Sequence, residues 1–106
     1  MKESKFQGNL IKEIKEKFPG AMVLKNDSSY IQGIPDLSVF YRDKYAFLEC
    51  KKSENEKHQP NQDHYVERID GMSFARFIYP ENKEEVLHEL QELFEPERAT
   101  CVSKSE

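Results

Sequence analysis

Two alternating runs, residues 36–41 and 45–51, lie only three residues apart, and this pair constrains the fold of the chain more than any other feature. Side chains alternate between the two faces of a strand, so each run has one apolar face. The intervening residues 42–44 are polar and few enough to close an antiparallel hairpin. We therefore expect a β-hairpin whose two apolar faces point to the same side, because a slip of one residue would expose one of them.

The hairpin leaves two registers open, and both bring the same charged residues together. A loop of residues 42–43 places Asp36 opposite Glu49. A loop of residues 43–44 places Asp36 opposite Lys51 instead. Because opposite Cβ atoms lie about 5 Å apart and diagonal ones about 7–8 Å apart, two carboxylates and an ammonium group gather on one face in either register.

This combination of groups suits a hard divalent cation. Magnesium takes oxygen ligands and is usually held by one or two carboxylates, with water and phosphate completing its octahedron. A lysine beside the ion supplies a point charge and hydrogen-bond donors. We therefore expect Asp36 and Glu49 to bind Mg²⁺, with Mn²⁺ as the alternative, and Lys51 to lie next to them.

The first helix is expected to bring a third carboxylate. Apolar residues recur at helical spacing over residues 6–18, with Ser4 as the expected cap and a Pro-Gly pair as the stop. Helical geometry places Glu3 inside this apolar stripe, where an unpaired carboxylate would be costly. Glu13 lies at the edge of the stripe and is the alternative.

The rest of the pattern completes a small α/β domain. Strands are expected at residues 21–25 and 74–79, and helices are expected at residues 60–71 and, after an Asn82 cap, up to residue 94. The resulting order, α-β-β-β-α-β-α, predicts an α/β sandwich. We expect one domain over residues 1–95 and a flexible tail over residues 96–106.

Length and composition exclude several classes of protein. A chain of 106 residues can bury one core but not two. Its net charge of −4 argues against a general nucleic-acid coat protein, yet it allows a carboxylate site that holds a metal. Cys50 and Cys101 are too few for a disulfide framework, and the sequence has neither a membrane span nor a secretory segment. We expect a soluble cytoplasmic protein.

Three short motifs carry a resemblance to a known superfamily. The run IPD at residues 34–36 and the run ECK at residues 49–51 resemble the Asp…Glu-x-Lys signature of the PD-(D/E)XK nucleases. Together with QG at residues 32–33 and PNQ at residues 60–62, they resemble the virus-type replication-repair nuclease (VRR-NUC) branch, especially its small stand-alone phage members. The resemblance covers nearly the whole chain up to the last helix. It implies a restriction-endonuclease-like αβββαβ core with a mixed central sheet flanked by helices, plus a C-terminal helix.

The resemblance also implies roles for particular residues. Asp36 and Glu49 would bind the divalent metal, and Lys51 would position or activate the attacking water. Gln62 would be the helix residue that contacts the site, with Gln59 as its nearby competitor. The first-helix acid, also a metal ligand, would be Glu3, or Glu13 if the helix begins elsewhere.

The activity implied by the family is metal-dependent endonucleolytic hydrolysis of DNA. Small stand-alone members imply homodimers that act on branched DNA such as Holliday junctions, within the bacterial host if the gene is phage-encoded. A less selective nuclease for linear or single-stranded DNA, and a non-catalytic DNA-binding module with the same fold, are the alternatives. Lys25, Lys52 and Lys57 are the lysines expected to contact DNA phosphates.

Overall fold

A mixed sheet of four strands forms the centre of the protein in a computed structural model that describes residues 3–96. The elements, in chain order, are α1 (Glu3–Lys17), β1 (Met22–Lys25), β2 (Leu37–Tyr41), β3 (Lys44–Cys50), α2 (Pro60–Met72), β4 (Ala75–Ile78) and α3 (Lys83–Phe94). The strands lie side by side in the order β1-β2-β3-β4. The first three are antiparallel and β4 runs parallel to β3, so the predicted element order and α/β fold class are confirmed.

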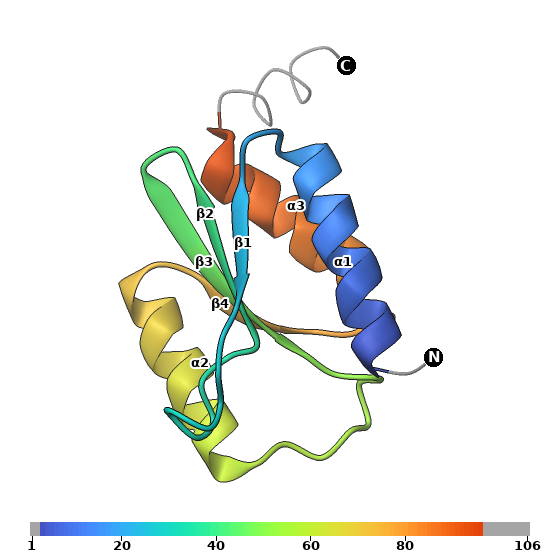
Figure 1. The fold of residues 1–106 in the computed structure, drawn as a ribbon, viewed down its shortest axis with the longest axis vertical. Coiled ribbons are helices and arrows are strands. Elements are labelled where there is room, and N and C mark those ends of the chain that lie inside the picture. Colours follow the sequence, from blue (N-terminus) through green and yellow to red (C-terminus); the bar gives the residue numbers. More distant parts are fainter. Residues whose placement is uncertain (1–2, 97–106) are drawn as a thin grey trace.

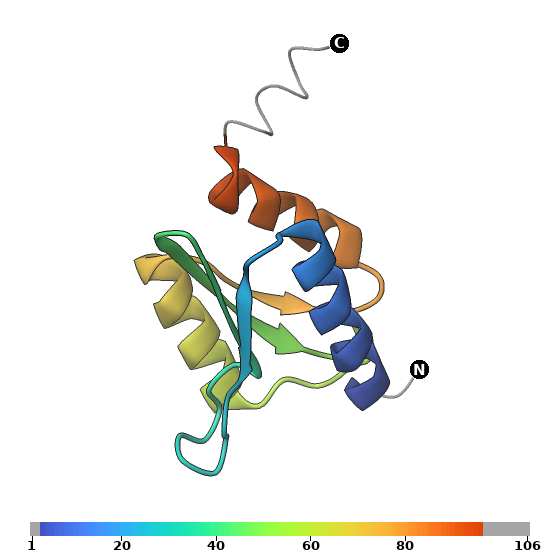
Figure 2. The ribbon, with the colours of Figure 1, turned by 45° about the horizontal axis from the view of Figure 1, so that its top comes forward.

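Helices cover both faces of the sheet. Figures 1 and 2 show α1 and α3 together on one face and α2 alone on the other. The main core lies between the sheet and the pair α1 and α3, where the apolar stripe of α1 meets that of α3. A smaller cluster joins Val66 and Ile69 of α2 to Ala75 of β4.

The hairpin between β2 and β3 adopts the first of the two predicted registers. Tyr41 pairs with Lys44 and Leu37 pairs with Leu48, so the loop consists of residues 42–43. Arg42 has a φ of 58°, the left-handed conformation that a two-residue hairpin often requires at its first loop position. This register aligns the apolar faces of both strands on the main core, as predicted.

Of the two predicted helix caps, Ser4 is wrong and Asn82 is confirmed in position. Helix α1 includes Glu3, so Ser4 lies within its first turn instead of preceding it. Asn82 does precede α3, but its side chain makes no capping hydrogen bond. Its amide accepts a hydrogen bond from the backbone N–H of Tyr79 and donates one to the carbonyl of Phe77, because these groups at the end of β4 compete for it.

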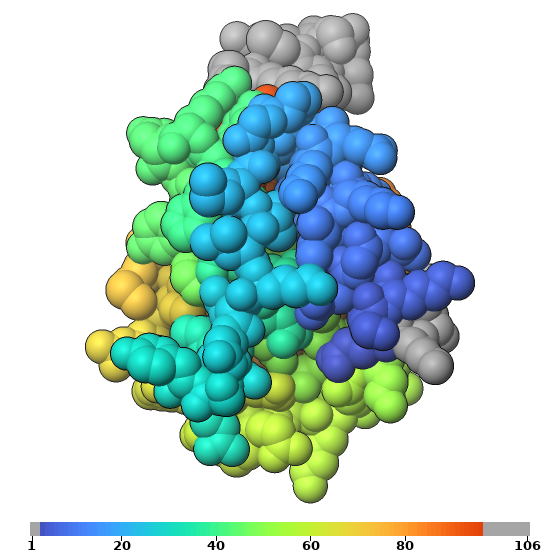
Figure 3. Space-filling model, in the orientation of Figure 1, coloured from blue at the N-terminus to red at the C-terminus, as the bar shows by residue number. Residues whose placement is uncertain are grey.

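One part of the sheet has no helix over it. Helix α2 packs on β3 and β4, whereas the same face of β1 and β2 leaves Met22, Leu24 and Phe40 exposed. Figure 3 shows β1 and the loop that follows it lying at the surface beside α1. The structure therefore has an open apolar strip along its antiparallel edge.

Within residues 3–96, none of the helices combines the length and the apolar character needed to cross a membrane. The predicted tail falls outside the described residues except for Pro96, and so does Cys101.

Candidate active site

The β2–β3 hairpin brings Asp36 and Glu49 together at its open end, where β2 begins and β3 ends. The backbone N–H of Asp36 donates a hydrogen bond to Oε1 of Glu49 at 3.1 Å. The backbone N–H of Cys50 donates one to Oδ2 of Asp36 at 3.0 Å. Glu49 is only 3% exposed because β3 is an inner strand, flanked by β2 and β4. Both carboxylates are therefore fixed by backbone groups of the neighbouring strand.

Lys51 lies directly beyond the end of β3 and is 2% exposed. Its backbone N–H still donates to the carbonyl of Ile78, so the pairing with β4 continues through this residue. Its ammonium group donates a hydrogen bond to Oε1 of Gln62 at 2.6 Å and lies 3.7 Å from Oε2 of Glu56. The positive charge is thus buried next to the carboxylates and held by two side-chain partners.

Gln62 connects the acidic and basic parts of the site. Its Nε2 donates a hydrogen bond to Oε2 of Glu49 at 2.6 Å, while its Oε1 accepts the bond from Lys51. The same oxygen also accepts the backbone N–H of Gln59 at 3.1 Å. Since an amide has one donor end and one acceptor end, these contacts define which end faces the carboxylate. Of the two glutamines considered from the sequence, Gln62 is the one that reaches Glu49 and Lys51.

Burial makes the negative charges of the site costly. It is the main cause that raises the pKa of Glu49 from 4.5 to about 8, with the nearby charge of Asp36 as the second cause, while Lys51 opposes both. The pKa of Asp36 is also raised by burial, although the hydrogen bond from Cys50 lowers it. Two carboxylates held close together, one buried and one half-buried, need a compensating positive charge.

Helix α1 places Glu3, not Glu13, near these carboxylates. The pKa of Glu3 is raised by partial burial and by the charges of Glu56 and Asp36, which shows that it shares their electrostatic environment. Glu13 instead forms an ion pair with Lys83 of α3, with 2.9 Å between Oε2 and Nζ. Of the two acids considered from the sequence, Glu3 is therefore the one close to the site.

The side chain of Cys50 points away from the site into the main core, where it is fully buried, as the alternation along β3 predicts. Burial raises the pKa of its thiol, and the side chain of Gln7 on α1 hydrogen-bonds to it. Cys50 therefore separates Glu49 from Lys51 along the chain but takes no part in their polar contacts.

The donor set of the site fits a hard divalent cation through two ligands. In the part of the chain that the structure describes, no three His, Cys, Asp or Glu side chains form a ready-made metal-binding group. Asp36 and Glu49 nevertheless supply carboxylate oxygens, the preferred ligands of Mg²⁺, and one or two such ligands are the usual number. Their raised pKa values reflect a buried negative charge that a divalent ion would neutralise.

The three lysines predicted to contact DNA are exposed. Lys25 ends β1, and Lys52 and Lys57 lie in the segment between β3 and α2. The charge of Lys52 also acts on Glu3, and the carbonyl of Lys57 lies 3.5 Å from the ammonium nitrogen of Lys51. Two of the three therefore lie close to the carboxylate site.

Two contributors were missed by the sequence analysis. Glu56 approaches Lys51 and also accepts the backbone N–H of Lys52 at 2.7 Å. Asn26 donates a hydrogen bond to the carbonyl of Pro35, the residue before Asp36, at 2.8 Å. Glu56 lies in a polar segment without periodicity, so no pattern marked it. Asn26 opens a polar, turn-rich loop over residues 26–29, which the sequence marks as a candidate functional segment only as a whole.

Comparison with known proteins supports a nuclease relationship. No family model matches the chain, and no curated protein matches it either. A solved structure described as a VRR_NUC domain is similar to it, with 29% sequence identity and a TM-score of 0.58, and the match covers 76% of this chain and 91% of that one. The likeness supports the VRR-NUC nuclease family and is consistent with a restriction-endonuclease-like fold.

Proposed function

We propose that this chain is a divalent-metal-dependent endodeoxyribonuclease of the small stand-alone, phage-type VRR-NUC branch of the PD-(D/E)XK nucleases. The observation that carries the proposal is the bridge from buried Glu49 through half-buried Gln62 to buried Lys51, beside Asp36. A module that only binds DNA gains nothing from burying two carboxylates and an ammonium group at one place, since burial of charge costs free energy. The similarity to a VRR_NUC domain supports a nuclease independently of this geometry.

Asp36 and Glu49 would hold the metal ion, and Glu3 is the candidate for a third ligand. We propose Mg²⁺, with Mn²⁺ as the alternative, because the donors are hard oxygens. Such an ion would polarise a phosphate oxygen and lower the pKa of a bound water.

The chain's own residues supply positioning and charge. The ammonium group of Lys51 would orient the attacking water and stabilise the negative charge that develops on the phosphate. In the reaction the water oxygen bonds to phosphorus, the bond from phosphorus to one bridging oxygen breaks, and that oxygen takes up a proton. Gln62 keeps Lys51 and Glu49 at a fixed separation, so neither needs to reorganise during this step.

Branched DNA is the proposed substrate, and a homodimer is the proposed active form. Two symmetric incisions across a junction require two sites related by a two-fold axis, which a homodimer provides. Lys25, Lys52 and Lys57 are proposed to contact the phosphates of the arms, since all three are exposed. The reaction would take place in the cytoplasm of a bacterial host.

The decisive experiment compares cleavage of a four-way junction, a flap and a linear duplex in Mg²⁺, Mn²⁺ or EDTA. We expect wild type to cut the junction with either metal and to be inactive in EDTA. Lys51→Ala should slow cleavage by about 100-fold or more, because a charge-stabilising donor is lost. Lys12→Ala, which removes an exposed lysine of α1, is the matched control and should retain full activity.

Other outcomes select among the alternatives. Cleavage that persists both in EDTA and in Asp36→Ala would exclude the metal mechanism. Equal cutting of linear and branched DNA would identify a less selective nuclease, and tight binding without any cutting would identify a binding module. Light scattering with and without junction DNA tests the dimer separately, and a mass of one chain under both conditions would exclude it.

A further inference from the structure

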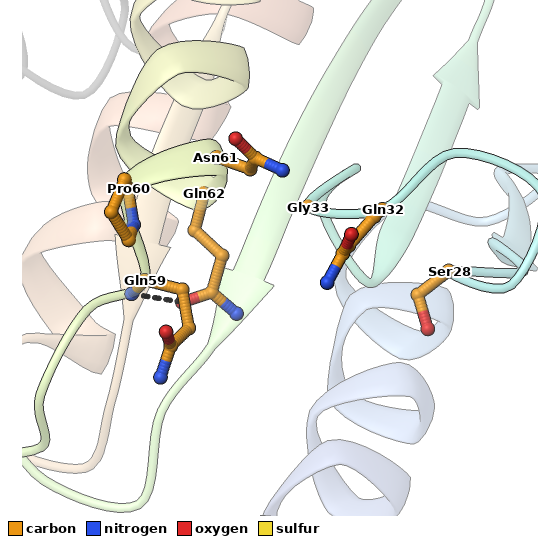
Figure 4. A pocket seen from close by; sticks show the side chains of 7 residues that line it. All are labelled: Ser28, Gln32, Gly33, Gln59, Pro60, Asn61 and Gln62. Carbon is orange, nitrogen blue, oxygen red and sulfur yellow. Dashed lines mark hydrogen bonds between the residues drawn. The ribbon is translucent and has the colours of Figure 1, made fainter.

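A polar pocket lies next to the candidate active site and shares one wall with it. The pocket has a volume of about 480 Å³ and lies between the loop that follows β1 and the first turn of α2. Figure 4 shows Ser28, Gln32 and Gly33 on the loop side and residues 59–62 on the helix side. Gln62 belongs to this lining and, through Nε2, to the carboxylate site as well. A molecule in the pocket would therefore lie one side chain away from Glu49.

The lining selects a neutral ligand with both donors and acceptors. All of its residues are uncharged, and four of them carry side-chain amides, at positions 32, 59, 61 and 62. A side-chain amide has an acceptor oxygen and two donor hydrogens. The oxygen of Gln62 is already engaged by Lys51 and by the backbone of Gln59, so the other three amides supply the acceptors. A phosphate group would instead call for arginine or lysine, and neither lines this pocket.

A nucleobase matches this chemistry and the size of the pocket. The edges of bases carry alternating donors and acceptors, and Asn and Gln are the side chains that pair with such edges in two-point contacts. Pro60 adds an apolar surface for the flat ring. A base inside a duplex cannot enter a pocket of this kind, because it is stacked and paired, so the occupant must be unpaired.

The pocket walls are held in place. Gly33 has a φ of +91° and packs so closely on Asn61 that an added Cβ would collide with the Cβ of that residue. The end of the loop is tied by the hydrogen bond from Asn26 to the carbonyl of Pro35. On the opposite side, Gln62 is oriented by Glu49, Lys51 and the backbone of Gln59. The backbone of both walls and the Gln62 amide are therefore in place before any ligand arrives, which lowers the cost of binding.

We propose that this pocket binds an unpaired nucleobase of the DNA strand whose phosphate occupies the Asp36–Glu49 site. The inference rests on the proposed nuclease function and adds a reason for substrate choice. Junctions and flaps present unpaired or easily unpaired bases beside a duplex, whereas an intact linear duplex does not. Gln32 and Asn61 are the specificity residues, because both are exposed to an incoming base.

The test uses a flap DNA that carries the fluorescent base 2-aminopurine at one position at a time around the branch. Binding is measured with Ca²⁺ in place of Mg²⁺. We expect one position to brighten several-fold when wild type binds, because the base leaves its stack. Gln32→Ala and Asn61→Ala should each weaken that DNA complex about 2- to 10-fold, the effect of one lost neutral hydrogen bond. Asn9→Ala, an exposed amide on α1, is the matched control and should behave as wild type.

A thermodynamic cycle then identifies the base in the pocket. An abasic site at the bright position should weaken binding to wild type but should have little further effect on Gln32→Ala, because both changes remove the same contact. Fully additive losses, or the lack of any bright position, would overturn the proposal. Cleavage in Mg²⁺ without a bright position would leave the nuclease function intact while excluding the pocket. A bright position without cleavage of any DNA would support base binding in the pocket and would exclude the nuclease function.

Discussion

Gln62 has a chemical role that neither charged partner can replace. Glu49 and Lys51 lie two residues apart in the chain without a close ion pair between them; the amide lies between them and hydrogen-bonds to both. A neutral bridge leaves the carboxylate able to take a cation and the ammonium group able to take a phosphate or a water. A direct ion pair would have reduced both capacities by neutralising the two charges against each other.

Replacing Gln62 by methionine, which has a similar shape but no amide, should lower both activity and stability. Glu49 and Lys51 are buried and would each lose a hydrogen-bond partner, and an unsatisfied buried polar group costs about 1–3 kcal/mol. We expect kcat to fall by about 10- to 100-fold, since two reacting groups lose their positioning. Gln91→Met on α3 is the matched control for urea unfolding and single-turnover kinetics. An unchanged kcat in Gln62→Met would exclude the positioning role.

Glu49 makes stability depend on pH when no metal is present. Its pKa is about 8 in the folded chain but near 4.5 when it is solvated, so the folded state binds more protons between these values. The free energy of unfolding should therefore fall as the pH rises from about 5 to about 8, by up to a few kcal/mol. Urea unfolding in EDTA across this range measures the effect.

Two further measurements identify the group responsible for the pH effect. Glu49→Gln cannot ionise, so most of the slope should disappear in this variant. Mg²⁺ should flatten the wild-type profile, because a bound cation favours the ionised carboxylates. A wild-type profile in EDTA that rises over the same range would contradict the assignment.

At the scale of elements, α2 connects packing to chemistry. Its buried residues Val66 and Ile69 rest on the sheet in the smaller apolar cluster, and the same helix carries Gln62 one turn earlier. Helices α1 and α3 form the main core with the sheet, and neither supplies a residue of the Glu49–Gln62–Lys51 bridge. Damage to the two cores should therefore have different consequences for catalysis.

Val66→Ala and Val86→Ala are matched substitutions that test this difference. Both valines are buried, one on α2 and one on α3, and each truncation should cost about 1–3 kcal/mol of stability. Only Val66→Ala should also reduce kcat at a temperature where both variants are folded, because it loosens the packing of α2 that positions Gln62. Equal kcat values for the two variants would show that α2 packing and Gln62 positioning are independent.

At the scale of the whole molecule, the net charge opposes the binding of DNA. The net charge of −4 repels a polyanion, so binding depends on local cations and on ionic strength. Lys52 and Lys57 lie in the segment that carries Glu56, beside the carboxylates, while Lys25 lies at the end of β1. We therefore expect these few lysines to supply most of the phosphate contacts.

The salt dependence of junction binding measures those contacts one by one. Each of Lys25→Ala, Lys52→Ala and Lys57→Ala should reduce the slope of log K against log salt by about 1 if that lysine neutralises a phosphate. Lys12→Ala should leave the slope unchanged. A lysine whose removal does not alter the slope lies off the path of the DNA.

The sequence by itself determined the hairpin and the gathering of its charged residues. Side-chain alternation and the even number of loop residues are local rules, so they place Asp36, Glu49 and Lys51 on one side whichever register forms. The same local rules predicted the element order and the burial of Cys50. Their success has a physical cause: each depends on neighbours in the chain or across a single turn.

Only the tertiary structure decided how distant segments meet at the site. It selected Glu3 over Glu13 through the packing of α1, placed Gln62 between Glu49 and Lys51 through the packing of α2, and brought Glu56 to the lysine. It also formed the pocket between the first loop and α2. These contacts join residues that are far apart along the chain, and such meetings follow from the fit of whole helices against the sheet, which no local periodicity encodes.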